Sequence, residues 1–370
     1  MNRIHLIAAA RPNFMKIAPL YHALREEAWA DPVVVHTGQH YDLNMSDVFF
    51  QDLGLPEPHI HLGVGSGTHA EQTGQVMMAY EKVLMGQRPD LVVVVGDVNS
   101  TMAATLAAVK LGVPTAHLEA GLRSFDRTMP EEINRVVTDA LADFLWTPSP
   151  DGDENLLREG VPAERIKRVG NIMIDSLEML RGRVEQEKAY EAYDVRAGEY
   201  GLVTLHRPAN VDRDDVLGQI VSGLCEAAGK LPLVFPVHPR TWKGLDRSGL
   251  LSTLAACPGI RLSDPLGYIP FMNLVFNSRV VITDSGGIQE ETTHLGIPCL
   301  TLRPNTERPV TISQGTNRLC TPGDFRERFL EAVEVGRKEI TPIEFWDGHT
   351  AERVVESIRA FWQNNLGQDD

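Results

Sequence analysis

At roughly 150 residues per domain, the 370-residue chain is long enough for two to three domains. Its 35 lysines and arginines against 50 aspartates and glutamates give a formal net charge of −15. This balance argues against binding to nucleic acid or an anionic membrane, since both require a basic face. No apolar run approaches the roughly 20 residues of a membrane span. We therefore expect a soluble, cytoplasmic, multi-domain protein that binds neither nucleic acid nor membrane.

Short apolar runs alternate with segments of helical periodicity along the whole chain. They predict strands at Ile4–Ala9, Val33–Thr37, Leu91–Val95, Pro114–Leu118 and Phe144–Trp146, and again at Gly201–Leu205, Leu233–Pro236, Arg279–Thr283 and Pro298–Leu302. Helices are predicted at Asn13–Glu27, Ala70–Gly86, Thr101–Leu111 and Glu131–Leu141. Strands that do not alternate between apolar and polar residues are typical of parallel sheets covered on both faces. Two successive runs of this kind indicate an α/β chain of two Rossmann-like, doubly wound domains.

The joint between the domains is expected near Val169–Asn171, which gives domains of residues 1–170 and 171–350. A last helix is predicted from about His349 to Trp362. Parallel sheets bind ligands beyond the carboxyl ends of their strands. With two such domains, we expect the active site in the interdomain cleft.

The four cysteines, Cys225, Cys257, Cys299 and Cys320, are far apart and form no CxxC pair. Reduced, buried thiols are the expectation in a cytosolic protein. His59 and His61 have no third ligand near them in sequence, so no metal site is predicted.

Two segments after predicted strands could hold an anion. Arg11 and Lys16 lie around a predicted helix N-terminus, where they suit a phosphate or carboxylate, or are simply solvated cations. Ser285-Gly286-Gly287 follows another strand, and its glycines would let backbone N–H groups approach a diphosphate. The alternative is that Ser285 only caps the helix. Glu291, one turn further on, could accept hydrogen bonds from ribose hydroxyls, or only complement the helix dipole.

Three acids lie at or beside strand ends in the first half: Asp97, Glu119 and Glu131. Carboxylates that share a poorly hydrated cleft are suited to general acid–base chemistry. Each has a structural alternative: Asp97 could cap a helix, and Glu131 fits a capping box with Thr128 or an ion pair with Arg135. Glu119 is the hardest to explain structurally. Together the three favour a proton-transfer site.

Further polar residues follow other strands. His206, directly after Gly201–Leu205, can titrate near neutral pH or donate to an anion, or it is a satisfied structural histidine. Arg308 offers another cation to the cleft. We interpret Gln39 and His40 as cleft lining or an effector contact.

In order along the chain these segments resemble the non-hydrolysing UDP-N-acetylglucosamine 2-epimerase family. The resemblance is carried by Arg11-Pro12 with Lys16, Gln39-His40, Gly96-Asp97, His117 to Arg123, Pro130 to Arg135, Gly170-Asn171, His206-Arg207, Asp284 to Glu291 and Thr306 to Pro309. It implies a fold of glycosyltransferase-B type, with the terminal helix (residues 351–366) packing back on the first domain. It also implies a homodimer.

The resemblance assigns roles residue by residue. Asp97, Glu119, Glu131 and His206 look like the catalytic set, with Arg135 supporting them. The implied binding residues are Arg11, Lys16 and Arg308 for the nucleotide sugar, Ser285, Gly286 and Gly287 for the diphosphate, Glu291 for the ribose and Phe271 beside the uracil. The implied reaction is reversible C2 epimerisation through 2-acetamidoglucal and UDP, without a metal or redox cofactor.

Two sequence features differ from the family. Leu266 stands where many members carry a glutamine before the Tyr268 to Phe271 segment, so uracil contacts would run through the backbone. Tyr41 to Asn44 differs from the usual run beside an activator site. The competing functions are the same reaction on a diacetamido uronic acid, a glycosyltransferase of the same fold, and a nonenzymatic sugar-nucleotide sensor.

Overall fold

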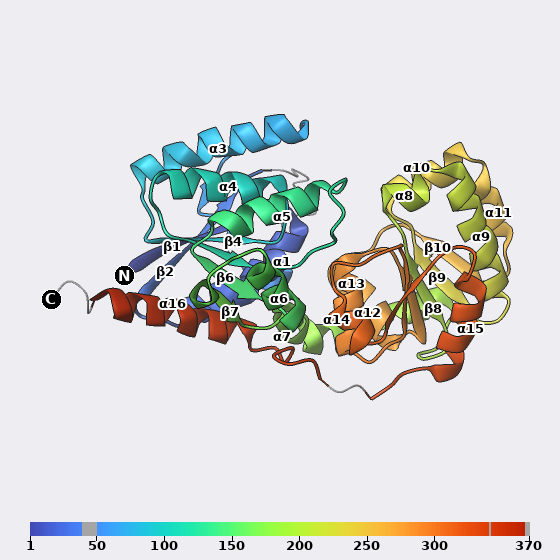
Figure 1. Cartoon of the computed structure of the whole chain (residues 1–370). Helices are drawn as coiled ribbons and strands as arrows, with labels where there is room; N and C mark the ends of the chain where they lie inside the picture. The colour runs from blue at the N-terminus through green and yellow to red at the C-terminus, as the bar shows by residue number, and fades with distance from the viewer. Residues whose placement is uncertain (39–49, 340–341, 367–370) are drawn as a thin grey trace. The chain divides into compact units, whose positions relative to one another are not determined.

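The computed structural model describes residues 1–38, 50–339 and 342–366 (Figure 1). Gln39 and His40, as well as Tyr41 to Asn44, lie outside the described residues. The chain forms two compact units. The first comprises Met1–Met179 together with the chain from Glu344 onward, and the second comprises Leu180–Ile343. Among the described helices, none is both long enough and apolar enough to cross a membrane.

The first unit is built on a seven-stranded parallel sheet of order β3-β2-β1-β4-β5-β6-β7. Its strands are β1 (Asn2–Ala8), β2 (Ala30–His36), β3 (Ile60–His61), β4 (Leu91–Val95), β5 (Thr115–Leu118), β6 (Phe144–Thr147) and β7 (Ile166–Arg168). The described helices are α1 (Arg11–Arg25), α3 (His69–Gly86), α4 (Asn99–Lys110), α5 (Pro130–Leu141), α6 (Pro150–Arg158) and α16 (Thr350–Leu366). Helix α7 (Ile172–Gln186) begins in this unit and ends in the second.

Helices cover both faces of this sheet, as Figure 1 shows. Apolar side chains of α3 and α4, such as Tyr80 and Ala104, form one core with Ile7, Val35 and Val94 of the strands. On the other face α1 packs on β1 and β2, and the terminal helix α16 packs against α1. Burial on both faces explains why the central strands read as continuous apolar runs.

The second unit carries a six-stranded parallel sheet of order β10-β9-β8-β11-β12-β13. Its strands are β8 (Gly201–Thr204), β9 (Leu233–Pro236), β10 (Ile260–Ser263), β11 (Val280–Thr283), β12 (Cys299–Leu302) and β13 (Asn317–Cys320). Its α-helices are α8 (Pro208–Val211), α9 (Asp214–Ala228), α10 (Pro239–Arg247), α11 (Leu250–Ala256), α12 (Tyr268–Asn277), α13 (Gly286–His294), α14 (Val310–Ser313) and α15 (Phe325–Val335). Two 3₁₀ turns lie at Ala163–Arg165 in the first unit and at Ala189–Tyr193 in the second. The expectation of two doubly wound α/β sheets is confirmed.

The expectation of reduced cysteines is wrong for one pair. Cys225 of α9 and Cys257 after α11 form a disulfide with a Cα–Cα distance of 5.6 Å. The two helices lie against each other, so the fold brings together cysteines that are 32 residues apart. Cys299 and Cys320 are free and buried, as expected.

Candidate active site

Helix α1 and the turns that follow β4 and β5 bring three of the predicted site residues together. A Cβ placed on Gly96, directly after β4, would lie 3.1 Å from the Lys16 Nζ and 3.4 Å from the Glu119 Oε2. Asp97 is the next residue along the chain. Gly96 has φ +68°, a conformation in which glycine is favoured. Lys16, Asp97 and Glu119 therefore surround one glycine turn.

Lys16 and Glu119 form a buried ion pair across 103 residues of sequence. Glu119 is only 3 % exposed, and its backbone has φ +78°, which is costly for a residue with a side chain. Its N–H donates to the Trp146 carbonyl at 3.0 Å, which holds the strained turn. A strand can end without a strained backbone residue and without a buried charged side chain, so the end of β5 does not by itself explain Glu119. This combination is typical of a functional site.

Asp97 forms an ion pair with Arg135 of α5, which is fully buried. The residue preceding α4 is Val98, and that helix has no side-chain cap, so the alternative in which Asp97 caps it is wrong. Asn134 donates to the Asp97 carbonyl at 2.9 Å and fixes the turn from the same helix. Two further N–H groups of Arg135 are buried with no hydrogen-bond partner in the described part of the chain.

Glu131 is exposed in the first turn of α5. Its capping-box alternative is wrong, because Met129 is the N-cap residue and the Thr128 hydroxyl donates to Asp126. The pair with Arg135 is also wrong, because among the described residues Arg135 forms its ion pair with Asp97 and not with Glu131. The neighbouring Glu132 has the structural role instead, since it accepts hydrogen bonds from Ser124 and Phe125. Arg11 is exposed at the first position of α1.

A buried network behind these turns was not identified from the sequence. His117 of β5 lies 2.8 Å from the Gly96 carbonyl through Nε2 and 2.6 Å from Asp139 through Nδ1. Asp139 also accepts from Arg123 at 2.7 Å and from the Gly121 N–H at 3.1 Å. His117, Gly121 and Arg123 lie in a segment that carries the family resemblance. Their pairing with Asp139 could not be predicted from it, because the members come from a strand, a loop and a helix that only the fold brings together.

In the second unit, Asp284 organises the loop after β8. This fully buried carboxylate accepts from the backbone N–H groups of His206 and Arg207 and from the Asn210 amide, at 2.9–3.1 Å. The His206 ring nitrogen Nδ1 lies 3.0 Å from the same carboxylate. Burial alone would raise the pKa of Asp284, but the hydrogen bonds from these groups and the His206 charge lower it. This contact fixes the orientation of the half-exposed His206 ring.

The N-terminus of α13 follows directly. Ser285 occupies the N-cap position, but its side chain makes no capping hydrogen bond, so the cap alternative does not account for it. A Cβ on Gly287 would meet nothing within 4 Å, whereas one on Gly286 would lie 2.7 Å from the Arg308 Nη1. The first turn of this helix is therefore bare on one side and faces a guanidinium on the other. Backbone N–H groups in a first helical turn are suited to bind anions.

Arg308 belongs to a buried group of charges beside this turn. It pairs with Glu290 and Glu307 at 2.8 Å each, and Glu307 also pairs with Arg303 at 3.1 Å. Arg207 lies 4.0 Å from Glu307. The Arg308 guanidinium lies beside Gly286, at the start of α13. Together with the N–H groups of the first helical turn, it is suited to bind an anion there.

Glu291 lies one turn into α13 and accepts a 2.9 Å hydrogen bond from the Tyr268 hydroxyl. Burial raises the pKa of Glu291 to about 8, and the nearby Glu290 charge contributes. The carboxyl group is therefore mostly protonated at pH 7 and can both donate and accept. Phe271 lies one turn after Tyr268 in α12, on the helix that this hydrogen bond joins to α13.

We expect Glu291→Gln to flatten the pH dependence of stability between pH 5 and 8.5. A carboxyl whose folded pKa is raised from 4.5 to about 8 stabilises the fold below its unfolded pKa, and this contribution is lost as the pH rises through about 8. At pH 8.5 the variant should be more stable than the wild type by about 2 kcal/mol or more. Urea unfolding at both pH values measures this, with the exposed Glu327→Gln as control. Parallel pH profiles of the wild type and Glu291→Gln would contradict it.

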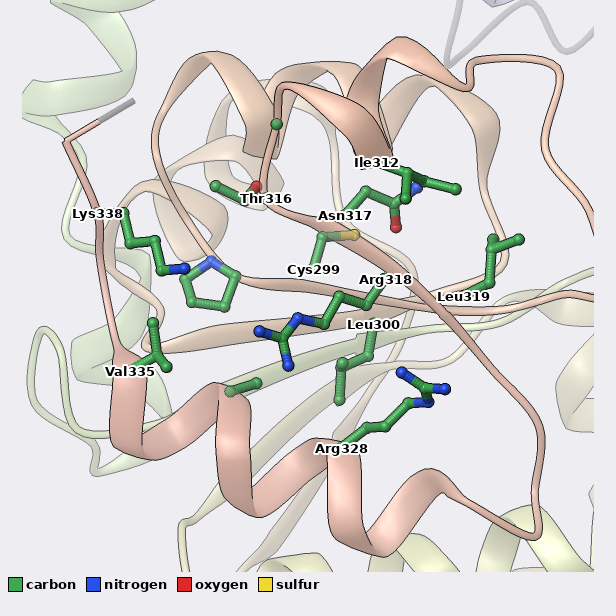
Figure 2. A pocket seen from close by; sticks show the side chains of 13 residues that line it. Cys299, Leu300, Ile312, Thr316, Asn317, Arg318, Leu319, Arg328, Val335 and Lys338 are labelled. Atoms are coloured by element: carbon green, nitrogen blue, oxygen red, sulfur yellow. The ribbon is translucent and has the colours of Figure 1, made fainter. Parts of the chain in front are cut away.

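A cavity of about 540 Å³ in the second unit does not coincide with these residues. Figure 2 shows that Arg318, Arg328, Lys338, Leu300 and Val335 surround it, between the last strands and α15. None of the predicted site residues lines it. Much of its lining comes from the amino-terminal halves of β12 and β13, away from the strand ends that carry Asp284.

Comparisons with known proteins agree with this chemistry. Residues 22–359 match the UDP-N-acetylglucosamine 2-epimerase family. A UDP-N-acetylglucosamine 2-epimerase of Methanocaldococcus jannaschii is 42 % identical over 363 residues, covering 96 % of this chain and 98 % of that protein. A UDP-2,3-diacetamido-2,3-dideoxy-D-glucuronate 2-epimerase of Pseudomonas aeruginosa is 40 % identical over 334 residues, covering 90 % and 91 %. The crystal structure of the M. jannaschii UDP-GlcNAc 2-epimerase with UDP-GlcNAc and UDP superposes with a TM-score of 0.87 at 40 % identity, covering 97 % and 99 %.

Proposed function

Because this chain belongs to the UDP-N-acetylglucosamine 2-epimerase family, we propose that it interconverts UDP-N-acetylglucosamine and UDP-N-acetylmannosamine by inverting C2. The observation that carries the proposal is the buried Lys16–Glu119 pair beside Asp97, on a turn that is strained at Glu119. It combines a carboxylate suited to proton transfer with a cation suited to a developing negative charge.

The proposed reaction has two steps, elimination of UDP and its re-addition. A carboxylate removes the C2 proton, the C1–C2 double bond forms, and the C1–O bond breaks with its electron pair leaving on UDP. The products are 2-acetamidoglucal and UDP. A proton is then delivered to the opposite face of C2, and UDP returns to C1. No oxidant or reductant is consumed.

The two units supply different parts of this chemistry. Asp97, Glu119 and Glu131 of the first unit and His206 of the second are the proposed acid–base set, with Arg135 orienting Asp97. A base on one face of C2 and an acid on the other are required for inversion.

UDP binding is proposed at the start of α13. Ser285, Gly286 and Gly287 supply N–H groups to the diphosphate, and Arg308, Arg11 and Lys16 supply positive charge as UDP departs. Glu291 would contact the ribose and Phe271 the uracil. The position of the Arg308 guanidinium beside Gly286 supports this assignment.

The second candidate substrate is a UDP-2,3-diacetamido uronic acid. It is favoured by the 40 % identity to the P. aeruginosa epimerase, which is close to the identity with the M. jannaschii enzyme. The chemistry at C2 would be the same, and only groups at C3 and C6 would differ.

The deciding experiment is epimerisation in D2O, with purified protein and no added NAD or metal. Because the C2 proton passes through side chains that exchange with solvent, we expect deuterium in the product at C2 and at no other ring carbon. NMR of the isolated sugar nucleotide measures both the epimer ratio and the label.

The alternatives give different results. Product without deuterium at C2 would contradict elimination. A glycosyltransferase would leave the sugar unlabelled at C2 with or without an acceptor, because glycosyl transfer does not break the C2–H bond. C2 labelling only with the diacetamido substrate would keep the mechanism and change the substrate.

We further propose that the protein is a cytoplasmic homodimer whose product feeds polysaccharide biosynthesis, as the family resemblance implies. Light scattering coupled to size-exclusion chromatography measures the oligomeric state. A mass of about 41 kDa, that of one chain, would contradict the dimer.

A further inference from the structure

The contacts of His117 restrict its protonation state. Its ring is completely buried, and both nitrogens face acceptors: the Gly96 carbonyl at 2.8 Å and the Asp139 carboxylate at 2.6 Å. A carbonyl oxygen never donates, and an ionised carboxylate does not donate either. A neutral imidazole carries one N–H, so either tautomer would place a lone pair against one acceptor. An unmet contact of this kind in a dry site is costly.

Asp139 is held in its ionised form by its other partners. It accepts from Arg123 at 2.7 Å and from the Gly121 N–H at 3.1 Å. Burial alone would raise the pKa of Asp139, but the charges and hydrogen bonds of His117 and Arg123 lower it. Arg123 is in turn bound by Glu159 through two hydrogen bonds of 2.7–2.8 Å.

If His117 is protonated, it and Arg123 are two cations, and they balance the two anions Asp139 and Glu159. Asp139 comes from α5, Arg123 from the loop after β5, and Glu159 from the end of α6. On the sheet, His117 lies between Val94 and Leu145 of the neighbouring strands, which carry no charge. Beyond Gly96 lies the Lys16–Glu119 pair, which is itself neutral overall.

We propose that His117 is a doubly protonated imidazolium that positions Asp97 and Glu119 for the C2 proton transfer. Its Nε2–H fixes the carbonyl of Gly96, directly before Asp97, while its partner Asp139 fixes the N–H of Gly121, two residues after Glu119. One buried network therefore holds both turns that carry the carboxylates. The positioning role rests on the proposed epimerase function, whereas the protonation state does not.

The protein itself offers a matched comparison. His5 of β1 is also completely buried in the same sheet, but its Nδ1 faces only the Tyr80 hydroxyl, at 3.0 Å. Burial lowers the pKa of His5 to about 4, so this ring is neutral at physiological pH. The two histidines should differ in protonation although they are equally buried.

Nitrogen NMR of the full chain labelled with ¹⁵N-histidine tests the protonation state. Because both ring nitrogens of His117 face acceptors, we expect both to carry protons at pH 8.5. His5 should carry one proton, and the variants His117→Gln and His5→Gln assign the signals by subtraction. An unprotonated ring nitrogen in His117 at this pH would overturn the imidazolium, even if the epimerase activity were absent.

Kinetics test the positioning role. The His117→Gln variant should lower kcat at least tenfold while UDP affinity stays within twofold, because glutamine can replace only one of the two contacts. His5→Gln, which removes a buried histidine away from these turns, should keep kcat. Activities are normalised to the fraction of protein that binds UDP, so that a loss of folded protein does not count. A normal kcat for His117→Gln in a protein that epimerises C2 would leave His117 a core histidine and overturn its positioning role.

Discussion

Asp97→Asn, Glu119→Gln and Glu131→Gln are each expected to lower kcat by about two orders of magnitude or more. Each change replaces an ionisable carboxylate by a neutral amide and keeps the size of the side chain. The capping alternatives for Asp97 and Glu131 are excluded by the ends of α4 and α5, so a loss of activity is not a loss of helix stability. Steady-state kinetics in both directions measure the effect.

UDP affinity should change little in these variants, because carboxylates do not assist phosphate binding. Asp97→Asn and Glu119→Gln need an additional check, since they leave the buried Arg135 and Lys16 cations with a neutral partner. The melting temperatures of both variants should fall, while the UDP-bound fraction reports the folded protein. Glu81→Gln, on the exposed face of α3, is the matched control. Near-normal turnover in all three variants would contradict proton transfer by these acids.

The sequence predicted the central strands of each sheet but not its two edge strands. All nine predicted strands are present, within one to three residues at their ends. The four that were missed, β3, β7, β10 and β13, are the four edge strands. The central strand β4 is buried at all five positions, whereas β7 is buried at none. An edge strand covered on one side only has no continuous apolar run, and its pairing becomes apparent only in the fold.

Site prediction succeeded and failed for a similar reason. Strand ends identified Asp97, Glu119 and His206 as candidate site residues, because the end of a strand can be recognised from the local sequence. Their partners could not be read in this way. Lys16 pairs with Glu119, which is 103 residues away in sequence. Asp97 pairs with Arg135, in a helix that begins 33 residues later. The disulfide between Cys225 and Cys257 was missed for the same reason, since helix packing and not spacing brings the two cysteines within reach.

Gly287→Val is expected to weaken UDP binding at least 100-fold while leaving the second unit folded. No atom lies within 4 Å of a Cβ at this position, so the protein itself has room for a side chain. The room is beside the first turn of α13, where N–H groups are available to the proposed diphosphate. A side chain there would occupy the position of the ligand, and a 100-fold loss corresponds to about 2.7 kcal/mol.

The matched control is Gly218→Val in α9 of the same unit, where a Cβ also meets nothing within 4 Å. Both substitutions replace glycine in a helix by valine, which is the better helix former of the two, so the intrinsic effect on the helix is similar and small, about 0.5 kcal/mol or less. Calorimetric titration with UDP should therefore separate them: Gly218→Val binds like the wild type and Gly287→Val does not. If both variants bound UDP normally, the open space beside Gly287 would not be the diphosphate site, and Arg308 would have to bind the nucleotide from elsewhere around the cluster.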